Sequence, residues 1–387
     1  MTRIAPPRVA VLGAGPVGLE AAIYAVAAGL PVTVYDAGPP AAAVERWGFV
    51  RLFSPFGLNA SPLGRQLIFR DAPNHSSPAD GDLLTGREYR EAYLLPLARS
   101  SALAPHIFPD TRVLAVGRGG WRKSDPTAGR LPPFRLLLRD TRGERFEAAD
   151  VVLDCTGTLA RPNWVGDGGI PAAGELAARQ FIVSGVDDIL GTRRGVYAGR
   201  TVLVVGSGYS AATVVTDLTA LAEEHQATWV VWLTQGPKTA PLPRLLNDPL
   251  KERDRLAVRA NHLAGRCDGN LEYHAHAQID ELISHGPDKG FRVAGRVAGK
   301  PAEWDVDRVI AAVGTRPDMT VCAELRVDEP AGEIETDEPG YFVLGSKALG
   351  RDSNFLIRDG FNHIRRAFAS VAGRPTLDLY RAAARAA

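Results

Sequence analysis

Two glycine-rich stretches have the spacing that binds the pyrophosphate of a dinucleotide. Residues 13–18 read GAGPVG and residues 206–211 read GSGYSA, and each follows an apolar, β-branched run and precedes a helix-compatible stretch. A strand, a glycine turn and a helix in this order present backbone N–H groups and the positive end of a helix dipole to an anionic ligand. Two such turns in one chain indicate two nucleotide sites.

Each glycine of the first turn has a distinct predicted role. Gly13 permits the tight exit from the strand, Gly15 lets the backbone approach the pyrophosphate, and Gly18 lets the helix pack closely on the sheet. The next strand, residues 32–35, ends at Asp36. A carboxylate there accepts hydrogen bonds from a ribose 2′-hydroxyl and repels a 2′-phosphate, which favours FAD or NAD over NADP. A glycine-rich turn that binds nothing is the alternative interpretation.

The second turn differs at its third glycine and at the end of the following strand. Ala211 replaces that glycine, a variant that the fingerprint allows, and no acid follows the strand at residues 229–233. Without a carboxylate to repel it, a 2′-phosphate is accepted, and Lys238 or Arg244 are candidates to pair with it. This site therefore favours NADPH, with NADH as the alternative. Two observations weaken this preference for NADPH. Gln235 occupies the position where an arginine would bind the phosphate more firmly. Lysines in loops, such as Lys238, commonly contact only solvent.

Composition restricts the functional classes. The 387 residues, 45% of them hydrophobic, suffice for two domain cores, and a net charge of +1 gives no field to attract nucleic acid or an anionic membrane. The three cysteines, Cys155, Cys267 and Cys322, include no Cys-x-x-Cys pair, which argues against a disulfide framework and a local dithiol centre. Residues 9–34 imitate a signal peptide or membrane span, but Glu20 and the glycine fingerprint favour a soluble, cytoplasmic protein.

The elements around these turns are predicted to repeat one architectural unit. Predicted strands between the turns are residues 111–116, 134–139, 145–148 and 151–154, with residues 140–144 as a polar turn. After the second turn, the predicted strands are residues 291–293, 309–313 and 341–344. A Rossmann half, an antiparallel meander and a strand that ends in a Thr/Gly turn therefore occur twice.

These features together resemble the two-dinucleotide-binding-domain flavoproteins. The resemblance is carried by the first turn with Asp36, the strand end at Thr156 and Gly157, the second turn, and the AVGTRPD segment at residues 312–318. The superfamily includes pyridine nucleotide–disulfide reductases, low-molecular-weight thioredoxin reductases, and flavin-containing and N-hydroxylating monooxygenases. The resemblance implies an α/β fold of two Rossmann-like, doubly wound, three-layer domains that place a nicotinamide against a flavin ring. The implied boundaries are residues 1–165 and 317–387 for the FAD domain and residues 190–316 for the inserted NAD(P)H domain.

Four departures from the family patterns narrow the chemistry. The inserted domain has no Cys-x-x-Cys, no cysteine pair follows the first helix, and residues 181–191 lack the histidine of the Phe-x-Gly-x-x-x-His signature of flavin-containing monooxygenases. Many relatives close the FAD site with Gly-Asp, where this chain has Gly345 and Ser346 followed by Lys347. Ser346 is a candidate partner for a ribityl hydroxyl. Lys347 is a candidate neighbour of the N1–O2 edge, where a cation favours reduced flavin, or else a solvent-exposed loop lysine.

The most unusual local stretch is residues 46–61, which combine aromatic side chains with Arg46, Arg51 and Asn59. It follows the Asp36 strand at the distance where superfamily members surround the isoalloxazine. Residues 59–61 are loosely similar to the Asn-x-Ser of flavin-containing monooxygenases, whose asparagine lies beside flavin and NADP⁺. The alternative is a turn-rich loop in which Asn and Ser bond their own backbone.

The candidate residues fall into two groups. The candidate cofactor-binding residues are Gly13, Gly15, Pro16, Val17, Gly18, Asp36, Arg46, Val113, Thr156, Gly157, Gly206, Gly208, Tyr209, Ser210, Ala211, Gln235, Lys238, Gly345 and Ser346. The candidate catalytic residues are Arg51, Asn59 and Lys347. No metal site is predicted, because His274 and His276, expected on one face of a strand, have no third ligand at metal spacing.

The expected reaction is reduction of bound FAD by NADPH. With no dithiol visible, the favoured acceptor is O2, which would form a C4a-(hydro)peroxide of the flavin and oxygenate a small-molecule substrate, as in a single-component monooxygenase. The alternatives are an NAD(P)H-dependent reductase or diaphorase acting on a quinone, disulfide or partner protein, and a redox sensor without turnover. No membrane or nucleic-acid partner is expected, and the sequence leaves the oligomeric state open, with a homodimer as one candidate.

Overall fold

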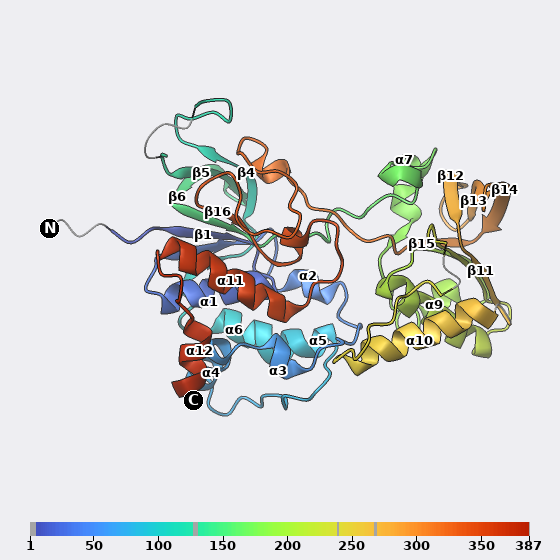
Figure 1. The fold of residues 1–387 in the computed structure, drawn as a ribbon, viewed down its shortest axis with the longest axis horizontal. Helices are drawn as coiled ribbons and strands as arrows, with labels where there is room; N and C mark the ends of the chain where they lie inside the picture. Colours follow the sequence, from blue (N-terminus) through green and yellow to red (C-terminus); the bar gives the residue numbers. More distant parts are fainter. Residues whose placement is uncertain (1–4, 127–130, 238–239, 267–268, 387) are drawn as a thin grey trace. The chain divides into compact units, whose positions relative to one another are not determined.

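The two apolar runs that precede the glycine turns are central strands of two separate parallel sheets in the computed structural model (Figure 1). The structure describes residues 5–126, 131–237, 240–266 and 269–386. The chain forms two units, unit 1 from residues 1–161 and 316–387, and unit 2 from residues 162–315. The segment 166–189, which the sequence-based boundaries left between the domains, lies in unit 2.

Unit 1 is built on a five-stranded parallel sheet with the order β16-β7-β1-β2-β3. Its strands are β1 (Val9–Leu12), β2 (Val32–Tyr35), β3 (Ile107–Phe108), β7 (Val151–Asp154) and β16 (Tyr341–Val343). All residues of β1 and β7 are buried, as expected of strands covered on both faces. The carboxyl ends of β1, β2, β7 and β16 lie side by side, which is where ligands bind in open α/β sheets.

Helices cover one face of this sheet and an antiparallel sheet covers the other (Figure 1). The first layer contains α1 (Pro16–Ala27) and α11 (Ile357–Val371), and the second contains β4 (Arg112–Arg118), β5 (Phe134–Asp140) and β6 (Gly143–Ala149). The ring of Phe134 in β5 meets that of Tyr341 in β16 edge to face, with centroids 6.1 Å apart. The sheet is therefore the middle of three layers.

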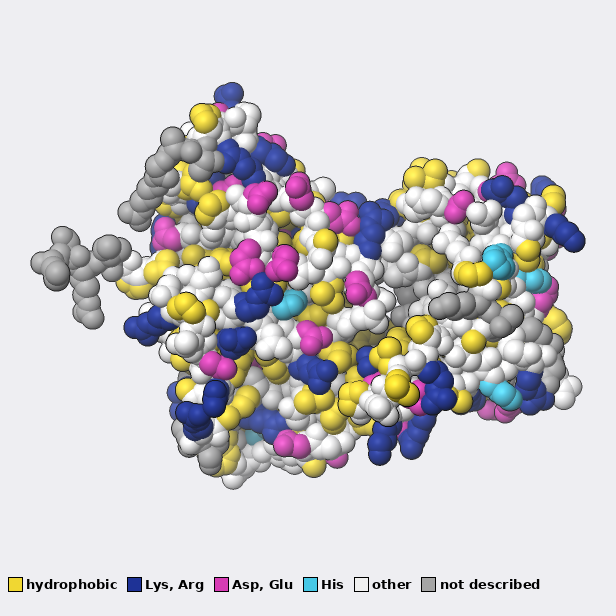
Figure 2. All heavy atoms as spheres, in the orientation of Figure 1, with side chains coloured by type: hydrophobic (Ala, Val, Ile, Leu, Met, Phe, Trp, Pro, Cys, Tyr) yellow, Lys and Arg dark blue, Asp and Glu magenta, His cyan; other side chains and the backbone are white. Residues whose placement is uncertain are grey.

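Shorter elements complete unit 1. They are α2 (Ala42–Glu45), α3 (Phe56–Asn59), α4 (Pro62–Asp71), α5 (Gly86–Tyr89), the π-helix η1 (Arg90–Leu94), α6 (Leu95–Arg99), α12 (Leu379–Ala386), and the 3₁₀ turns η2 (Ala104–His106), η5 (Thr320–Cys322) and η6 (Gly345–Leu349). The Ser61 hydroxyl accepts a hydrogen bond from the Gly64 N–H and caps α4, and Thr85 forms a capping box with Glu88 at α5. On the face of unit 1 seen in Figure 2, acidic and basic side chains are interspersed.

Unit 2 repeats the layered plan around a parallel sheet with the order β11-β10-β9-β15-β8. Its strands are β8 (Val183–Ser184), β9 (Thr201–Val205), β10 (Trp229–Leu233), β11 (Leu271–His274) and β15 (Arg308–Ala311), and the antiparallel sheet is β12 (Ala277–Ser284), β13 (Phe291–Val297) and β14 (Lys300–Val306). Its helices are α7 (Glu175–Ala178), α8 (Arg194–Tyr197), α9 (Tyr209–Glu224), α10 (Lys251–Arg266), and the 3₁₀ turns η3 (Asp167–Gly169) and η4 (Arg179–Phe181).

The alternation of side chains along β9 explains the two cores of unit 2. Val202 and Val204 pack in the core that contains residues of α9 and α10, whereas Leu203 and Val205 pack in the core that contains residues of β12 and β13. Successive side chains of a strand point to opposite faces, so a continuous apolar run is needed where both faces are covered. The predicted duplication of Rossmann half and meander is confirmed by the two antiparallel three-stranded sheets.

Two local predictions were wrong. The expected turn at residues 140–144 is shorter, because β5 extends to Asp140, which pairs with Gly143 of β6; a φ of +113° at Gly143 permits the two-residue connection. His276 does not share a strand with His274, since β11 ends at His274 and His276 has a φ of +54°. Within the described ranges, no helix has the length and apolarity needed to cross a membrane.

Candidate dinucleotide sites

The three glycines of the first turn have different surroundings. Gly13 has a φ of +99°, and a β-carbon there would lie 2.8 Å from the carbonyl oxygen of Cys155. A β-carbon at Gly18 would lie 1.8 Å from the carbonyl oxygen of Gly13. At Gly15, in contrast, no atom lies within 4 Å of such a carbon. The fold itself requires Gly13 and Gly18, whereas Gly15 leaves open space at the start of α1.

The N-terminus of α1 has donors that face this open space. Gly15 is the N-cap of α1, and no side chain caps the helix. Among the described residues, no protein acceptor meets the backbone N–H groups of Gly15, Val17 and Gly18. Unpartnered N–H groups and the positive end of the helix dipole are the features that bind phosphate. This turn therefore fits the pyrophosphate of a dinucleotide.

The carboxylate of Asp36 is hydrogen-bonded to the glycine turn. Its Oδ2 accepts a hydrogen bond of 2.6 Å from the N–H of Ala14, and its Oδ1 accepts one of 2.9 Å from the N–H of Gly38. Burial raises the pKa of Asp36, and the two hydrogen bonds oppose that rise. The N–H of Thr111 donates to the Asp36 carbonyl at 2.7 Å, which brings the start of β4, with the half-buried Val113, beside the acid. Asp36 thus shapes the turn as well as standing where a ribose is expected.

A second group of predicted residues assembles at the same edge of the sheet. Gly157 has a φ of +67°, and a β-carbon there would lie 3.7 Å from the hydroxyl oxygen of Ser346. Gly345 has a φ of +73°, and its β-carbon would lie 3.2 Å from the side chain of Val17. The hydroxyl of Thr156 donates to Asp154 at 2.6 Å. The turns after β1, β7 and β16 therefore meet, as the flavin-site prediction requires.

Two residues of α11 at this edge were missed by sequence reasoning. A β-carbon at Gly360 would lie 2.7 Å from the side chain of Val17, and Nδ1 of His363 accepts a hydrogen bond of 3.2 Å from the Gly345 N–H. Burial lowers the pKa of His363, which keeps its imidazole neutral and able to accept. The signal was a glycine and a histidine three residues apart, which share one face of a helix.

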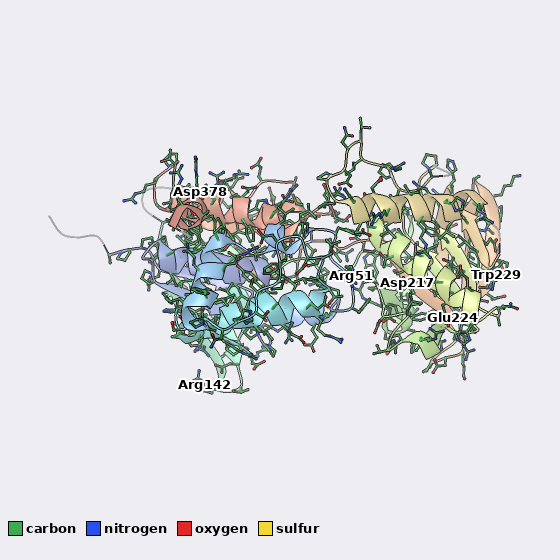
Figure 3. All side chains as sticks on the ribbon, turned by 90° about the horizontal axis from the view of Figure 1, so that it is seen from below. Arg51, Arg142, Asp217, Glu224, Trp229 and Asp378 are labelled. Carbon is green, nitrogen blue, oxygen red and sulfur yellow. The ribbon has the colours of Figure 1, made fainter. Side chains whose placement is uncertain are left out.

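The three candidate catalytic residues do not interact with one another in the described part of the chain. Within the described part of the chain, no hydrogen bond or ion pair joins any two of Arg51, Asn59 and Lys347. Arg51, labelled in Figure 3, is exposed, and its guanidinium donates to the carbonyl of Leu83. Asn59 is buried and exchanges hydrogen bonds with Ser54, as the alternative interpretation of this loop expected. Their catalytic roles stay predictions.

Lys347, Arg46 and Ser61 lie in different surroundings. The interpretation of Lys347 as a solvent-exposed loop lysine is wrong, because its side chain is 0% exposed and its ammonium lies 2.6 Å from Asp154. Arg46 is exposed at the end of α2. Ser61 caps α4. The loop of residues 46–61 bonds in large part to residues 80–93. The N–H of Leu52 donates to the carbonyl of Leu84, and the hydroxyl of Tyr89 donates to the carbonyl of Asn59.

Glu20, a buried acid on α1, has a raised pKa that the sequence did not predict. Glu20 is 0% exposed and accepts hydrogen bonds from the hydroxyls of Tyr93 in η1 and Tyr380 in α12, the latter at 3.3 Å. Burial raises the pKa of Glu20 to about 7, and the tyrosine hydrogen bonds only partly oppose it. No cation pairs with Glu20 within the described residues.

The second turn repeats the geometry of the first. Gly206 has a φ of +136°, and a β-carbon there would lie 2.2 Å from the carbonyl oxygen of Ala312. No atom lies within 4 Å of a β-carbon built at Gly208, the N-cap of α9. The described residues offer no acceptor to the N–H groups of Gly208, Ser210 and Ala211. The half-buried Tyr209 is the first residue of the helix, so this turn also fits a pyrophosphate.

The residues predicted to select a 2′-phosphate are only partly described. Gln235 is exposed after β10, and Lys238 lies outside the described residues. The guanidinium of Arg244 makes two hydrogen bonds, of 2.8 and 2.7 Å, to the carboxylate of Asp254. A phosphate would have to compete with that carboxylate for Arg244. Lys238 is therefore the better candidate of the two.

The two cysteines that the structure describes give no sign of a reactive thiol. Cys155 and Cys322 are free, and Cys267 lies outside the described residues. Burial and the neighbouring Asp154 carboxylate raise the pKa of Cys155 well above its ordinary value, and burial also raises that of Cys322. Both thiols are thus protonated near neutral pH, and a protonated thiol is a poor nucleophile.

Comparison with known proteins identifies the fold. No protein-family model matches the sequence, and no curated protein gives a significant match. Among solved structures, a bacillithiol disulfide reductase from Bacillus cereus is 18% identical, with a TM-score of 0.67 over 95% of this chain and 99% of that one. An ornithine N-hydroxylase from Kutzneria sp. 744, solved with reduced FAD, NADP⁺ and L-ornithine, is 17% identical, with a TM-score of 0.67 over 96% and 100%. A flavin monooxygenase from Stenotrophomonas maltophilia is 21% identical, with a TM-score of 0.61 over 96% and 99%. The chain therefore shares the fold of these three enzymes.

Proposed function

We propose that the chain is an FAD-dependent NAD(P)H oxidoreductase that holds FAD in unit 1 and NADPH in unit 2. The observation that carries this proposal is the pair of open helix N-termini, where Gly15 and Gly208 leave space. Within the described residues, no protein acceptor meets the N–H groups of Gly15, Val17 and Gly18 in α1, or those of Gly208, Ser210 and Ala211 in α9. One such site would serve a single nucleotide, whereas hydride transfer between two cofactors needs two. The similarity to the Kutzneria enzyme, solved with reduced FAD and NADP⁺, supports the same assignment.

The residues of unit 1 supply binding and orientation. The first turn of α1 would hold the FAD pyrophosphate, Asp36 the adenosine ribose, and Ser346 a hydroxyl of the ribityl chain. A bound flavin supplies the redox chemistry, since it accepts a hydride and passes electrons on singly or in pairs. In unit 2, the first turn of α9 would hold the NADPH pyrophosphate, and Lys238 is the proposed partner of the 2′-phosphate.

The favoured acceptor is O2, and the favoured activity is that of a single-component monooxygenase acting on a small molecule. This choice is supported by the protonated, unpaired state of Cys155 and Cys322, which gives no dithiol to relay electrons to a disulfide. The similarity to the Kutzneria and Stenotrophomonas monooxygenases supports it further.

A second candidate is an NAD(P)H-dependent reductase whose acceptor is a quinone, a disulfide or a partner protein. The similarity to the bacillithiol disulfide reductase, at the same TM-score as the ornithine N-hydroxylase, favours it. Such an enzyme would pass electrons directly from flavin to acceptor, because neither described cysteine is suited to attack a disulfide.

Rapid mixing separates these activities. The FAD-loaded protein is reduced with NADPH without oxygen and then mixed with oxygenated buffer while its absorbance spectrum is recorded. We expect a transient band that differs from both oxidised and reduced flavin, followed by return of the oxidised spectrum. Immediate reoxidation with stoichiometric peroxide would indicate the reductase. Failure of both NADPH and NADH to reduce the flavin would contradict the oxidoreductase and leave a redox sensor.

A further inference from the structure

Lys347 and Asp154 form an ion pair that is entirely buried in unit 1. Nζ of Lys347 lies 2.6 Å from Oδ2 of Asp154, and both side chains are 0% exposed. Asp154 is the last residue of β7, and Lys347 lies in η6, which follows the neighbouring strand β16. The turn at residues 156–157 follows one member of the pair, and the turn at residues 345–346 precedes the other.

The pair is the centre of a complete hydrogen-bond network. Lys347 also donates to the hydroxyl of Thr156 at 3.3 Å and to the carbonyl of Asp318 at 2.7 Å, which uses all three of its N–H bonds. Asp154 accepts further hydrogen bonds from the Tyr341 hydroxyl at 2.8 Å and from the N–H and hydroxyl of Thr156, at 3.1 and 2.6 Å. The desolvation of a buried pair offsets most of its attraction. Its main effect is therefore geometric, since it fixes three segments that are distant in sequence.

These contacts connect both turns of the proposed flavin site to the segments that lead to unit 2. Asp318, whose carbonyl accepts from Lys347, pairs through its carboxylate with Arg161 at 2.9 and 3.2 Å. Burial alone would raise the pKa of Asp318, but hydrogen bonds from Arg161 and Thr320 outweigh it and lower that pKa to about 2. The Asp318 carboxylate is therefore charged at neutral pH. Arg161 lies where the chain leaves unit 1, and Asp318 lies where it has just returned.

We propose that Lys347 is a positioning residue that acts through Asp154 and Thr156 to hold the turn at residues 156–157 against the turn at residues 345–346. The inference rests on the proposed FAD site. Lys347 has no N–H left to donate to a flavin, because all three are used inside the protein. The position of Ser346 beside Gly157, and with it the shape of the flavin site, depends on the pair.

The test compares Lys347→Met with the double variant Lys347→Met/Asp154→Asn. The single variant leaves a buried carboxylate without its cation, so both its melting temperature and its FAD affinity are expected to fall. The double variant buries no charge and is expected to regain most of the melting temperature. If Lys347 positions the turns, the double variant still binds FAD at least about tenfold more weakly than the parent. Its bound flavin also has an altered visible spectrum and reduction potential.

A second buried ion pair of unit 1 provides the control. Nε of Arg118 lies 2.7 Å from Oε1 of Glu338, and the side chains are 5% and 7% exposed. The double variant Arg118→Met/Glu338→Gln is expected to lose stability without any change in FAD affinity, spectrum or potential. Parental FAD affinity, spectrum and potential in Lys347→Met/Asp154→Asn would overturn the positioning role and leave the proposed function intact. A parent protein that binds no FAD would overturn both.

Discussion

The hydroxyl of Tyr380 in α12 donates a hydrogen bond of 3.3 Å to the carboxyl group of Glu20 in α1. The first turn of α1 is the proposed FAD pyrophosphate site, so an element 360 residues further along the chain contacts the helix that builds this site. The Tyr93 hydroxyl donates to the other carboxyl oxygen of Glu20. Two tyrosines thus hold an acid whose charge depends on pH near neutrality.

Glu20 is expected to make the protein less stable as the pH rises through the range from about 4.5 to about 7. In this window the folded protein keeps the proton of Glu20 while the unfolded chain has lost it, so each increase in pH favours the unfolded chain. Above about pH 7 the free energy of unfolding is lower by the full amount, about 3 kcal/mol. Glu20→Gln should remove this decline, as measured by denaturant unfolding across the range. Glu91→Gln, at an exposed acid of η1, is the control.

Gly15→Ala and Gly208→Ala are expected to weaken ligand binding without unfolding the protein. A methyl group at either position meets no protein atom within 4 Å, but it occupies the space proposed for a pyrophosphate. Gly15→Ala should lower FAD affinity about tenfold or more, and Gly208→Ala should raise the KM for NADPH while FAD content is unchanged. Gly195→Ala, at an equally open position in α8, is the control. Parental binding in both variants would exclude these turns as the sites.

Gly206→Ala should instead destabilise unit 2. Its φ of +136° is unfavourable for alanine, and the added carbon would lie 2.2 Å from the carbonyl oxygen of Ala312. We expect a loss of about 2 kcal/mol or more in the free energy of unfolding. Thermal unfolding compared with that of Gly208→Ala checks this, and equal stability of the two variants would be inconsistent with the close approach of Gly206 to Ala312.

Asp36→Ala is expected to lower the FAD content of the purified protein. The substitution removes the acceptor for the Ala14 and Gly38 N–H groups and the carboxylate proposed to bind a ribose hydroxyl. The flavin-to-protein absorbance ratio after purification measures the effect, and we expect a decrease of about tenfold in affinity. Asp305→Ala, at an exposed acid of β14 in unit 2, is the control. Unchanged flavin content would show that Asp36 does not contribute to FAD binding.

Lys238→Ala tests phosphate recognition in unit 2. A lost contact with the 2′-phosphate should reduce the ratio of kcat/KM for NADPH to that for NADH by about tenfold, with little change for NADH itself. Gln235→Arg should shift the preference in the opposite direction, because arginine binds a phosphate through two hydrogen bonds. An unaltered preference in Lys238→Ala would show that another residue selects the nucleotide.

Much of the architecture was predictable because its signals are local. The runs around β1, β7, β9 and β10 are apolar over the length of one strand, and the confirmed glycine turns depend on backbone conformations that neighbouring residues impose. The resemblance to the flavoprotein superfamily was likewise carried by short motifs, and the comparisons confirm the fold. The side-chain surroundings at the candidate site were less predictable. Asn59, for example, bonds to Ser54 within its own loop, which an Asn-x-Ser match does not reveal.

By itself, the sequence indicated where the tight strand-to-helix turns fall, because Gly13 and Gly206 adopt φ values of +99° and +136°, which glycine tolerates far better than other residues. Only the tertiary structure decided the state of the ionisable side chains. Lys347 changes from an apparent loop lysine to a buried cation because β16 pairs with β7 and brings it to Asp154, 193 residues away. The pairing of distant strands sets burial and partners, and these set the charge and geometry of a site.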